Sequence, residues 1–262
     1  MSIDIDLSGK VAAVTGGSRG IGRGIAEAHL KTGASVAING RNEGKGQQTI
    51  KEIGEDQPLV FIKGDVRKQS EVENFISKTI EKFGRLDILI NNAGGSGGFA
   101  PVSELTDEAW ENAAAWILHS TFWATRAALK DMTQRGWGRI INISSVEGRQ
   151  ANKENVAHYI TFKHAMNGFT KAVAFENGAK GITCNAVSPG AVETDLMMEQ
   201  GPAAAKSMGI SYEEFKQNYA QEASIKRLNT TDEVSGLAVF LCSELGSGIT
   251  GAILPVDGGT SL

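Results

Sequence analysis

The chain has 262 residues, and its 26 basic and 30 acidic side chains leave a net charge of −4. This length suits one large α/β domain, so we expect a single domain over residues 1–262. The absence of any basic run argues against nucleic acid or an anionic membrane as the partner, and a small molecule is expected instead.

The two cysteines and the N-terminal segment bear on the compartment. Cys184 and Cys242 both lie in apolar runs, which indicates buried thiols in a reducing compartment. The chain has no CxxC or Cys/His spacing, so no metal site is predicted. The start of the sequence has no basic region, and no apolar run approaches the roughly 18 residues of a membrane span. We therefore expect a soluble, cytoplasmic protein.

Short apolar runs alternate with longer amphipathic stretches along the chain. The runs predict buried strands at 11–15, 35–39, 59–65, 86–92, 138–145, 182–189 and 253–259. Helical patterns lie between them, at 21–32, 69–83, 107–132, 158–179 and 231–243. This alternation predicts a doubly wound (Rossmann) α/β fold, with a parallel sheet of about seven strands and helices on both faces. Residues 195–227 hold two helical fragments and no strand, and are a candidate lid where the strands end.

The first predicted strand runs into TGGSRGIG, Thr15 to Gly22, and then directly into a helix. Glycines at 16, 20 and 22 permit a tight turn and a close approach to a pyrophosphate, whose charge the helix N-terminus favours. The spacing is GxxxGxG rather than GxGxxG, and such a turn alone could be a tight connection, but its place after the first strand and at the start of a helix indicates a dinucleotide site.

The end of the second strand distinguishes between cofactors. An acidic side chain there would bind a free ribose 2′-hydroxyl, but the residues present are Asn39, Gly40 and Arg41. Arg41, helped by Arg19, could pair with a 2′-phosphate, which favours NADP(H) and leaves NAD(H) possible. The alternative is that Arg41 is a solvated loop charge.

The segment YITFK places Tyr159 and Lys163 four residues apart, on one face of a predicted helix. An ammonium at that distance favours the phenolate, so we expect the pKa of Tyr159 to fall below its usual value and the phenol to act as an acid or base. The alternative is a half-exposed tyrosine beside a solvated lysine.

Five motifs, namely TGGSRGIG, NNAG (Asn91 to Gly94), Ser145, YITFK and PGAVET (Pro189 to Thr194), occur together in this order. In order and spacing the chain resembles the short-chain dehydrogenase/reductase family from about Leu7 to Gly259, and looks most like its D-3-hydroxybutyrate dehydrogenase-like members. The resemblance implies that Tyr159 is the general acid or base, that Lys163 lowers its pKa and binds the nicotinamide ribose, and that Ser145 holds the substrate oxygen. It also implies a homotetramer.

The resemblance further implies which residues line the site. Cofactor-binding candidates, besides Tyr159 and Lys163, are Gly16, Ser18, Arg19, Gly20, Ile21, Gly22, Arg41, Asp65, Val66, Asn92, Ala93, Gly94, Pro189, Gly190, Val192 and Thr194, with Asn91 beside the nicotinamide ribose. Substrate-pocket candidates are Ser96, Glu147, Met197 and Met198.

The chain departs from the family at three places. Ile117 stands where the family has an Asn that holds a proton-relaying water, which casts doubt on that relay. One extra residue separates Ser145 from Tyr159, so Ser144 is an alternative working serine. Glu147 stands where hydroxybutyrate dehydrogenases have a His, and it would repel a carboxylate substrate unless it points to solvent.

These observations predict an oxidoreductase that moves a hydride between a nicotinamide cofactor and a ketone or secondary alcohol. Our first expectation is NADPH-dependent reduction of an uncharged or cationic ketone. One alternative is an NAD-dependent secondary-alcohol dehydrogenase, and another, suggested by Ile117, is a catalytically weak nucleotide-binding regulatory protein.

Overall fold

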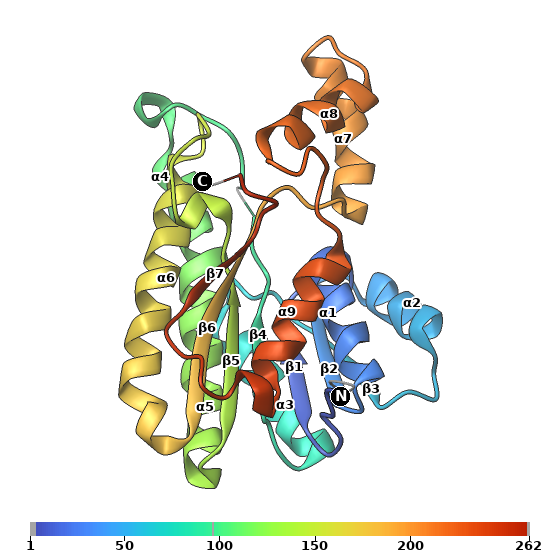
Figure 1. Ribbon diagram of the computed structural model, residues 1–262, viewed down its shortest axis with the longest axis vertical. Helices are drawn as coiled ribbons and strands as arrows, with labels where there is room; N and C mark the ends of the chain where they lie inside the picture. Colours follow the sequence, from blue (N-terminus) through green and yellow to red (C-terminus); the bar gives the residue numbers. More distant parts are fainter. Residues whose placement is uncertain (1–3, 96, 261–262) are drawn as a thin grey trace.

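A parallel sheet forms the centre of the molecule. The computed structural model describes residues 4–95 and 97–260 (Figure 1). The seven strands pair in the order β3-β2-β1-β4-β5-β6-β7, and every pairing is parallel. The strands are β1 (Val11–Val14), β2 (Ser35–Gly40), β3 (Leu59–Lys63), β4 (Ile88–Asn91), β5 (Gly138–Ile143), β6 (Ile182–Pro189) and β7 (Ile253–Val256). The seven predicted strands and the doubly wound fold are confirmed.

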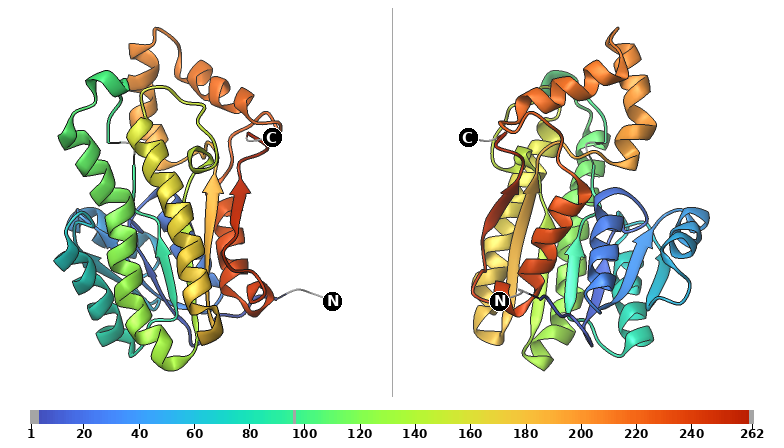
Figure 2. Two further views of the ribbon diagram at one scale, coloured as in Figure 1. Left: turned by 90° about the vertical axis from the view of Figure 1, so that its left-hand side faces the viewer. Right: turned by 45° about the vertical axis from the view of Figure 1, so that its right-hand side comes forward.

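Helices cover both faces of the sheet (Figure 2). They are α1 (Gly20–Lys31), α2 (Glu43–Ile53), α3 (Gln69–Phe83), α4 (Asp107–Ala113), α5 (Ser120–Arg135), α6 (Ala157–Asn177), α7 (Asp195–Ser207), α8 (Tyr212–Glu222) and α9 (Thr231–Cys242). Short 3₁₀ turns occur at Val102–Glu104, Val146–Gly148, Gly178–Lys180 and Glu244–Gly246. Helices α1 and α9 pack on one face and α3, α5 and α6 on the other, so the strands are apolar on both sides.

The predicted helix over 107–132 is not regular throughout. Its middle, Ala114–His119, is π-helical and joins α4 to α5. Two hydroxyls bond back to the widened turn: Ser120 Oγ donates to the Trp116 carbonyl at 2.6 Å, and Thr121 Oγ1 donates to that of Ile117 at 2.7 Å. A π-helical turn re-aims the side chains it carries, and such turns are frequent at functional sites.

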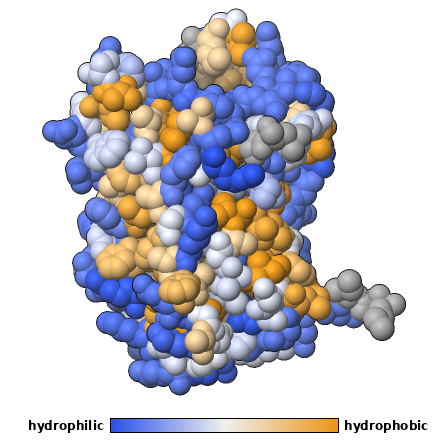
Figure 3. All heavy atoms as spheres, turned by 60° about the vertical axis from the view of Figure 1, so that its left-hand side comes forward, coloured by the Kyte–Doolittle hydropathy of each residue, from blue (hydrophilic) through white to orange (hydrophobic). Residues whose placement is uncertain are grey.

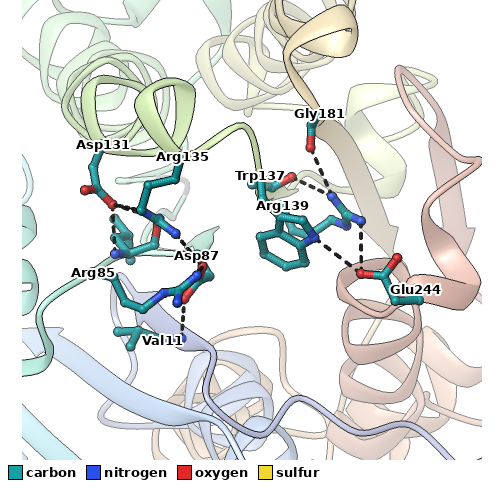
Figure 4. A network of polar contacts seen from close by, with 11 residues as sticks. Val11, Arg85, Asp87, Asp131, Arg135, Trp137, Arg139, Gly181 and Glu244 are labelled. Atoms are coloured by element: carbon teal, nitrogen blue, oxygen red, sulfur yellow. Dashed lines mark hydrogen bonds and ion pairs between the residues drawn. The ribbon is translucent and has the colours of Figure 1, made fainter.

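The amino ends of the strands are held by buried charges (Figure 4). Asp87, whose side chain has no exposed surface, accepts hydrogen bonds from Arg85 at 2.7 Å, Arg135 at 2.8 Å and the Val11 amide at 2.9 Å. Burial acts to raise the pKa of Asp87, but these bonds outweigh it and hold that pKa below its usual value. Nearby, Arg139 lies over the Trp137 ring, 4.3 Å from its centroid. These contacts tie the strands together at this end of the sheet, and the loops of the site lie at the other end.

Helices α7 and α8 stand beyond the carboxyl ends of the strands, apart from the sheet (Figures 1 and 2). They correspond to the two helical fragments predicted in 195–227. Thr194 caps α7 by accepting from the Met197 amide at 3.3 Å, and Ser211 caps α8 by accepting from the Glu214 amide at 3.1 Å. Among the described residues, no helix is long and apolar enough to cross a membrane.

Candidate active site

The glycine turn lies at the carboxyl ends of β1 and β4, where the strand order reverses. Gly16 and Gly20 have φ values of +66° and +54°, which residues other than glycine rarely adopt. A Cβ on Gly22 would lie 2.4 Å from Asn92 Nδ2 and 2.5 Å from the Gly16 carbonyl, so the start of α1 packs directly against the turn. In open α/β sheets this switch point is where ligands bind.

The loop after β4 is fastened to the same turn. Asn92 Nδ2 donates to the Thr15 carbonyl at 2.9 Å, and the Ala93 amide donates to Thr15 Oγ1 at 3.1 Å. Asn91 points into the sheet instead, where its Nδ2 donates to Asn142 Oδ1 at 2.8 Å. The structure therefore places Asn92 and Ala93 at the candidate cofactor crevice and makes Asn91 part of the buried polar core.

The end of β2 presents cations and no carboxylate. Asn39 is buried and donates to the Ile62 and Gly64 carbonyls, each at 3.1 Å, so it ties β2 to the chain after β3. The exposed Arg41 guanidinium lies over the Trp116 ring, 5.6 Å from its centroid. Lys45 adds a second cation in the first turn of α2.

Further cofactor candidates follow β3 and β6 in the chain. Asp65 is held by Arg67 Nη2 at 2.6 Å, which keeps the pKa of that carboxyl below its usual value, and Val66 beside it is buried. Gly190 packs so closely that a Cβ would lie 2.9 Å from Asp257 Cα, while Val192 bridges to Asn229. The other candidates are Ser18 and Arg19 in the glycine turn, Ile21 in the first turn of α1, Pro189 at the end of β6 and Thr194 just before α7.

These residues could hold a nicotinamide dinucleotide. At the start of α1, the Gly20 amide donates to Asp195 Oδ2 at 3.3 Å, and a Cβ on Gly20 would lie in ordinary contact with Thr194, at 3.6 Å. Amides of that helix start can bind a pyrophosphate. Three cations lie near this helix start: Arg19 in the glycine turn, Arg41 after β2 and Lys45 in α2.

Ser145 and Tyr159 meet where β5 and α6 face each other. Their side chains are hydrogen-bonded, and Ser145 Oγ also accepts from the Glu147 amide at 3.2 Å. Ser144 Oγ, by contrast, is buried with no hydrogen-bond partner among the described residues. The geometry therefore favours Ser145 over Ser144.

Lys163 is buried one helical turn beyond Tyr159. Its ammonium donates to the Ile143 carbonyl at 2.6 Å and lies 5.6 Å from the centroid of the tyrosine ring. Burial lowers the pKa of Lys163 from 10.5 to about 7, so close to neutral pH the amine can release or accept a proton.

The expectation that the pKa of Tyr159 falls below its usual value is wrong for this arrangement. Burial raises the pKa of the phenol, the Ser145 hydrogen bond lowers it, and the nearby negative charge of Glu147 raises it further. Because burial also depresses the pKa of Lys163, the lysine carries only part of a positive charge at neutral pH. Tyr159 is consequently a protonated phenol at neutral pH, the form that an acid catalyst needs.

Ile117 stands beside Lys163. A Cβ built on Gly94 would lie 3.7 Å from both Lys163 Nζ and Ile117 Cγ1, so the two side chains border the same glycine. Ile117 is fully buried in an apolar cluster with Phe162 and Met166. Near Lys163, Ile117 therefore provides neither a donor nor an acceptor for a relay water.

Glu147 does not point to solvent, so that alternative is wrong. Only 5% of the residue is exposed, and burial raises the pKa of its carboxyl, which accepts a hydrogen bond from the Asn152 backbone. Its charge raises the pKa of Tyr159, and Lys153 and Glu222, the latter on α8, act on the pKa of Glu147 itself.

Lys153 links the loop after β5 to the candidate lid. It forms an ion pair with Glu222 and lies 4.6 Å from the centroid of the Tyr219 ring, both on α8. Met197 is partly buried and Met198 is 52% exposed on α7. Ser96 lies outside the described residues. Sequence reasoning missed Trp116 and Lys45 at the crevice, because neither belongs to a motif.

The chain is similar to known proteins over nearly its whole length. Residues 16–261 match the family model described as enoyl-(acyl carrier protein) reductase. The chain is 38% identical over 255 residues to a D-beta-hydroxybutyrate dehydrogenase of Cupriavidus necator, covering 97% of this chain and 98% of that one. It is 36% identical over 260 residues to a short chain dehydrogenase/reductase of Aspergillus oryzae, covering 98% and 96%.

Solved structures of similar chains include cofactor complexes. An L-sorbose reductase from Gluconobacter frateurii, complexed with NADPH and L-sorbose, superposes with a TM-score of 0.93 at 30% identity and 98% coverage of both chains. A single-substitution variant of actinorhodin polyketide ketoreductase with NADPH superposes with a TM-score of 0.90 at 35% identity, covering 96% of this chain and 97% of that one.

Proposed function

The chain belongs to the short-chain dehydrogenase/reductase family of nicotinamide-dependent oxidoreductases, and we propose that it is an NADPH-dependent reductase of uncharged or cationic ketones. The cations after β1 and β2 are the main observation in favour of NADPH as the cofactor. With no acidic side chain at the end of β2 and with Arg41 at that place, the site favours a 2′-phosphate over a free hydroxyl. Two similar structures contain NADPH, which supports the same choice.

Tyr159, Ser145 and Lys163 perform the proton chemistry in this proposal. A bound reduced nicotinamide would supply the hydride for the carbonyl carbon, and the carbonyl oxygen would then need a hydrogen bond and a proton. The Ser145 hydroxyl stabilises that oxygen, and Tyr159 donates its proton to it. Lys163, with a pKa of about 7, can return a proton to Tyr159 near neutral pH. This step does not need the family's water-binding Asn, whose place Ile117 takes.

The raised pKa of Tyr159 favours reduction over oxidation. A phenol that stays protonated at neutral pH is ready to act as an acid, whereas alcohol oxidation needs the phenolate. Oxidation should therefore require a higher pH. The assembled trio of Ser145, Tyr159 and Lys163 also argues against the alternative of a regulatory protein without catalysis.

Glu147 sets the substrate charge in this proposal. A carboxylate substrate would place a second negative charge in a largely desolvated site, at a cost on the order of several kcal/mol. An amine or a hydroxyl at the far end of the ketone would instead gain a partner in Glu147. Hydroxybutyrate dehydrogenases act on a carboxylate, so the resemblance to those relatives does not extend to this residue.

Several copies of the chain are proposed to assemble. Phe175 on α6 is 92% exposed and Phe122 on α5 is 40% exposed, and these helices adjoin through Phe122 and Phe169, whose ring centroids are 6.1 Å apart. Figure 3 shows apolar residues interspersed with polar ones over this side of the molecule. Large apolar side chains on adjoining helices suit contact with a second copy. Sedimentation velocity should give a species larger than one chain, and a monomer would contradict this part of the proposal.

The experiment that tests the function compares three ketone classes with NADPH, by the loss of absorbance of the reduced nicotinamide. Neutral and amine-bearing ketones should be reduced efficiently, and acetoacetate poorly. Efficient turnover of acetoacetate would overturn the proposed substrate class. No turnover of any ketone by the wild-type chain, with bound NADPH detected by fluorescence, would favour the regulatory alternative.

A further inference from the structure

Two carboxylates on the first turns of α7 reach the candidate cofactor crevice. Asp195 and Glu199 are four residues apart and so lie on one side of the helix. Asp195 Oδ2 accepts a hydrogen bond from the Gly20 amide at 3.3 Å. The carboxylate of Glu199 pairs with Arg19 at 3.4 Å and with Lys45 at 3.3 Å. Residues 154 to 180 positions apart in the sequence are thus joined across the crevice.

The donors in these contacts are those that the cofactor phosphates need. The Gly20 amide is at the N-terminus of α1, where the pyrophosphate of a dinucleotide is expected. Arg19 and Lys45 are cations at the glycine turn and at the start of α2, and with Arg41 they form the positive edge of the crevice. Asp195 therefore binds a donor that the pyrophosphate would use, and Glu199 binds cations that a 2′-phosphate would use.

We propose that Asp195 and Glu199 compete with the cofactor for these donors, so that cofactor binding releases the first turns of α7. The inference rests on the proposed NADP(H) function and adds two residues that tune cofactor affinity. Asp195 lowers the affinity for both cofactors, because each of them contains a pyrophosphate. Glu199 lowers the affinity for NADP(H) in particular, because NAD(H) has no 2′-phosphate that would bind Arg19 and Lys45.

The contacts are weak enough for a phosphate to displace them. The side chains of Arg19, Lys45 and Glu199 are 40%, 54% and 52% exposed, so solvent screens both pairs. A phosphate monoester carries more charge than a carboxylate and offers three acceptor oxygens. The apparent affinity for the cofactor equals the intrinsic affinity multiplied by the fraction of molecules in which the donors are free. Because the competing pairs are weak, that fraction is not small, and the effect is limited to several-fold.

The test measures dissociation constants of NADP⁺ and NAD⁺ by calorimetry for the wild-type chain and three variants. Glu199→Gln should tighten NADP⁺ about three- to fivefold and leave NAD⁺ unchanged. Asp195→Asn should tighten both cofactors by similar factors. The matched control is Glu193→Gln: this carboxylate precedes α7 and pairs with Lys216 at 3.8 Å, so neither constant should change.

Hydrogen exchange gives a second readout. Addition of NADP⁺ to the wild-type chain should speed exchange in the first turns of α7, and Glu199→Gln should show part of that increase without cofactor. Unchanged NADP⁺ affinity in Glu199→Gln, or an equal gain for NAD⁺, would overturn the role of Glu199. A wild-type chain that binds NAD⁺ and not NADP⁺ would instead overturn the proposed cofactor and the Glu199 half together, while Asp195→Asn with NAD⁺ still decides the other half.

Discussion

Replacement of Lys163 by Met should change how the stability of the fold depends on pH. In the folded chain the pKa of Lys163 is about 7, whereas the ordinary value that the unfolded chain adopts is 10.5. Between these two pH values the unfolded state binds more protons than the folded state, so stability rises with pH there and is lowest below pH 7.

The size of the effect follows from the two pKa values. A separation from about 7 to 10.5 corresponds to a penalty of about 5 kcal/mol for the buried ammonium below pH 7. Met has a similar length and no charge. The substitution removes the hydrogen bond to the Ile143 carbonyl, which lowers the free energy of unfolding by about 1–3 kcal/mol. Lys163→Met should therefore be more stable than wild type at pH 7, and this advantage should shrink by about 2 kcal/mol between pH 7 and pH 9.

The assay is urea unfolding followed by circular dichroism at pH 7, 8 and 9 without added cofactor. Lys171→Met on the exposed side of the same helix is the matched control, and its profile should run parallel to that of wild type. A Lys163→Met profile that is also parallel to wild type would refute the reasoning, because it would mean that burial does not depress the pKa of Lys163.

Three further substitutions test the proposed roles. Tyr159→Phe should lower kcat about 10²- to 10⁴-fold with little change in the dissociation constant of NADP⁺, and retention of a tenth of the rate would remove Tyr159 from its role. Arg41→Asp should lower kcat/KM for NADPH by about tenfold or more and improve NADH, since a repelling charge replaces the partner of the phosphate; unchanged NADPH kinetics would make Arg41 a solvated loop charge. Glu147→Gln removes a negative charge that raises the pKa of Tyr159, so the pH at which alcohol oxidation reaches half its maximum should fall, and amine-bearing ketones should bind less tightly. An oxidation profile that stays in place or moves to higher pH would contradict that role of Glu147.

The fold could be predicted from the sequence because local patterns determine it, whereas the roles of Ser145 and Tyr159 in one site are expected from the family resemblance. Apolar runs separated by amphipathic stretches dictate strands and helices, and parallel strands bring their carboxyl ends, with the loops that follow, to one edge of the sheet. The i, i+4 spacing alone places Lys163 beside Tyr159.

The charge states at the site could not be predicted in this way. Whether Lys163 raises or lowers the acidity of Tyr159 depends on how deeply both are buried, which is a property of the packed structure. The position of Glu147 likewise depends on the path of the loop around it. The π-helical turn that carries Trp116 and Ile117 has no sequence signature that distinguishes it from an ordinary helix.

The contacts of α7 are also invisible in the sequence. In the sequence, Asp195 is an ordinary acid in the first turn of a helix, where acidic residues are common, and Glu199 is an acid of the following turn. Only the folded chain shows that their partners are the Gly20 amide, Arg19 and Lys45. Such long-range pairs need the tertiary arrangement.

The most direct test of the central claim is the ratio of kcat/KM for NADPH to that for NADH, measured with the wild-type chain and the best neutral ketone at pH 7. Arg19, Arg41 and Lys45 around a 2′-phosphate, with no carboxylate to bind a free 2′-hydroxyl, predict a ratio of about ten or more. A ratio below one would contradict the proposal and would favour the NAD-dependent secondary-alcohol dehydrogenase.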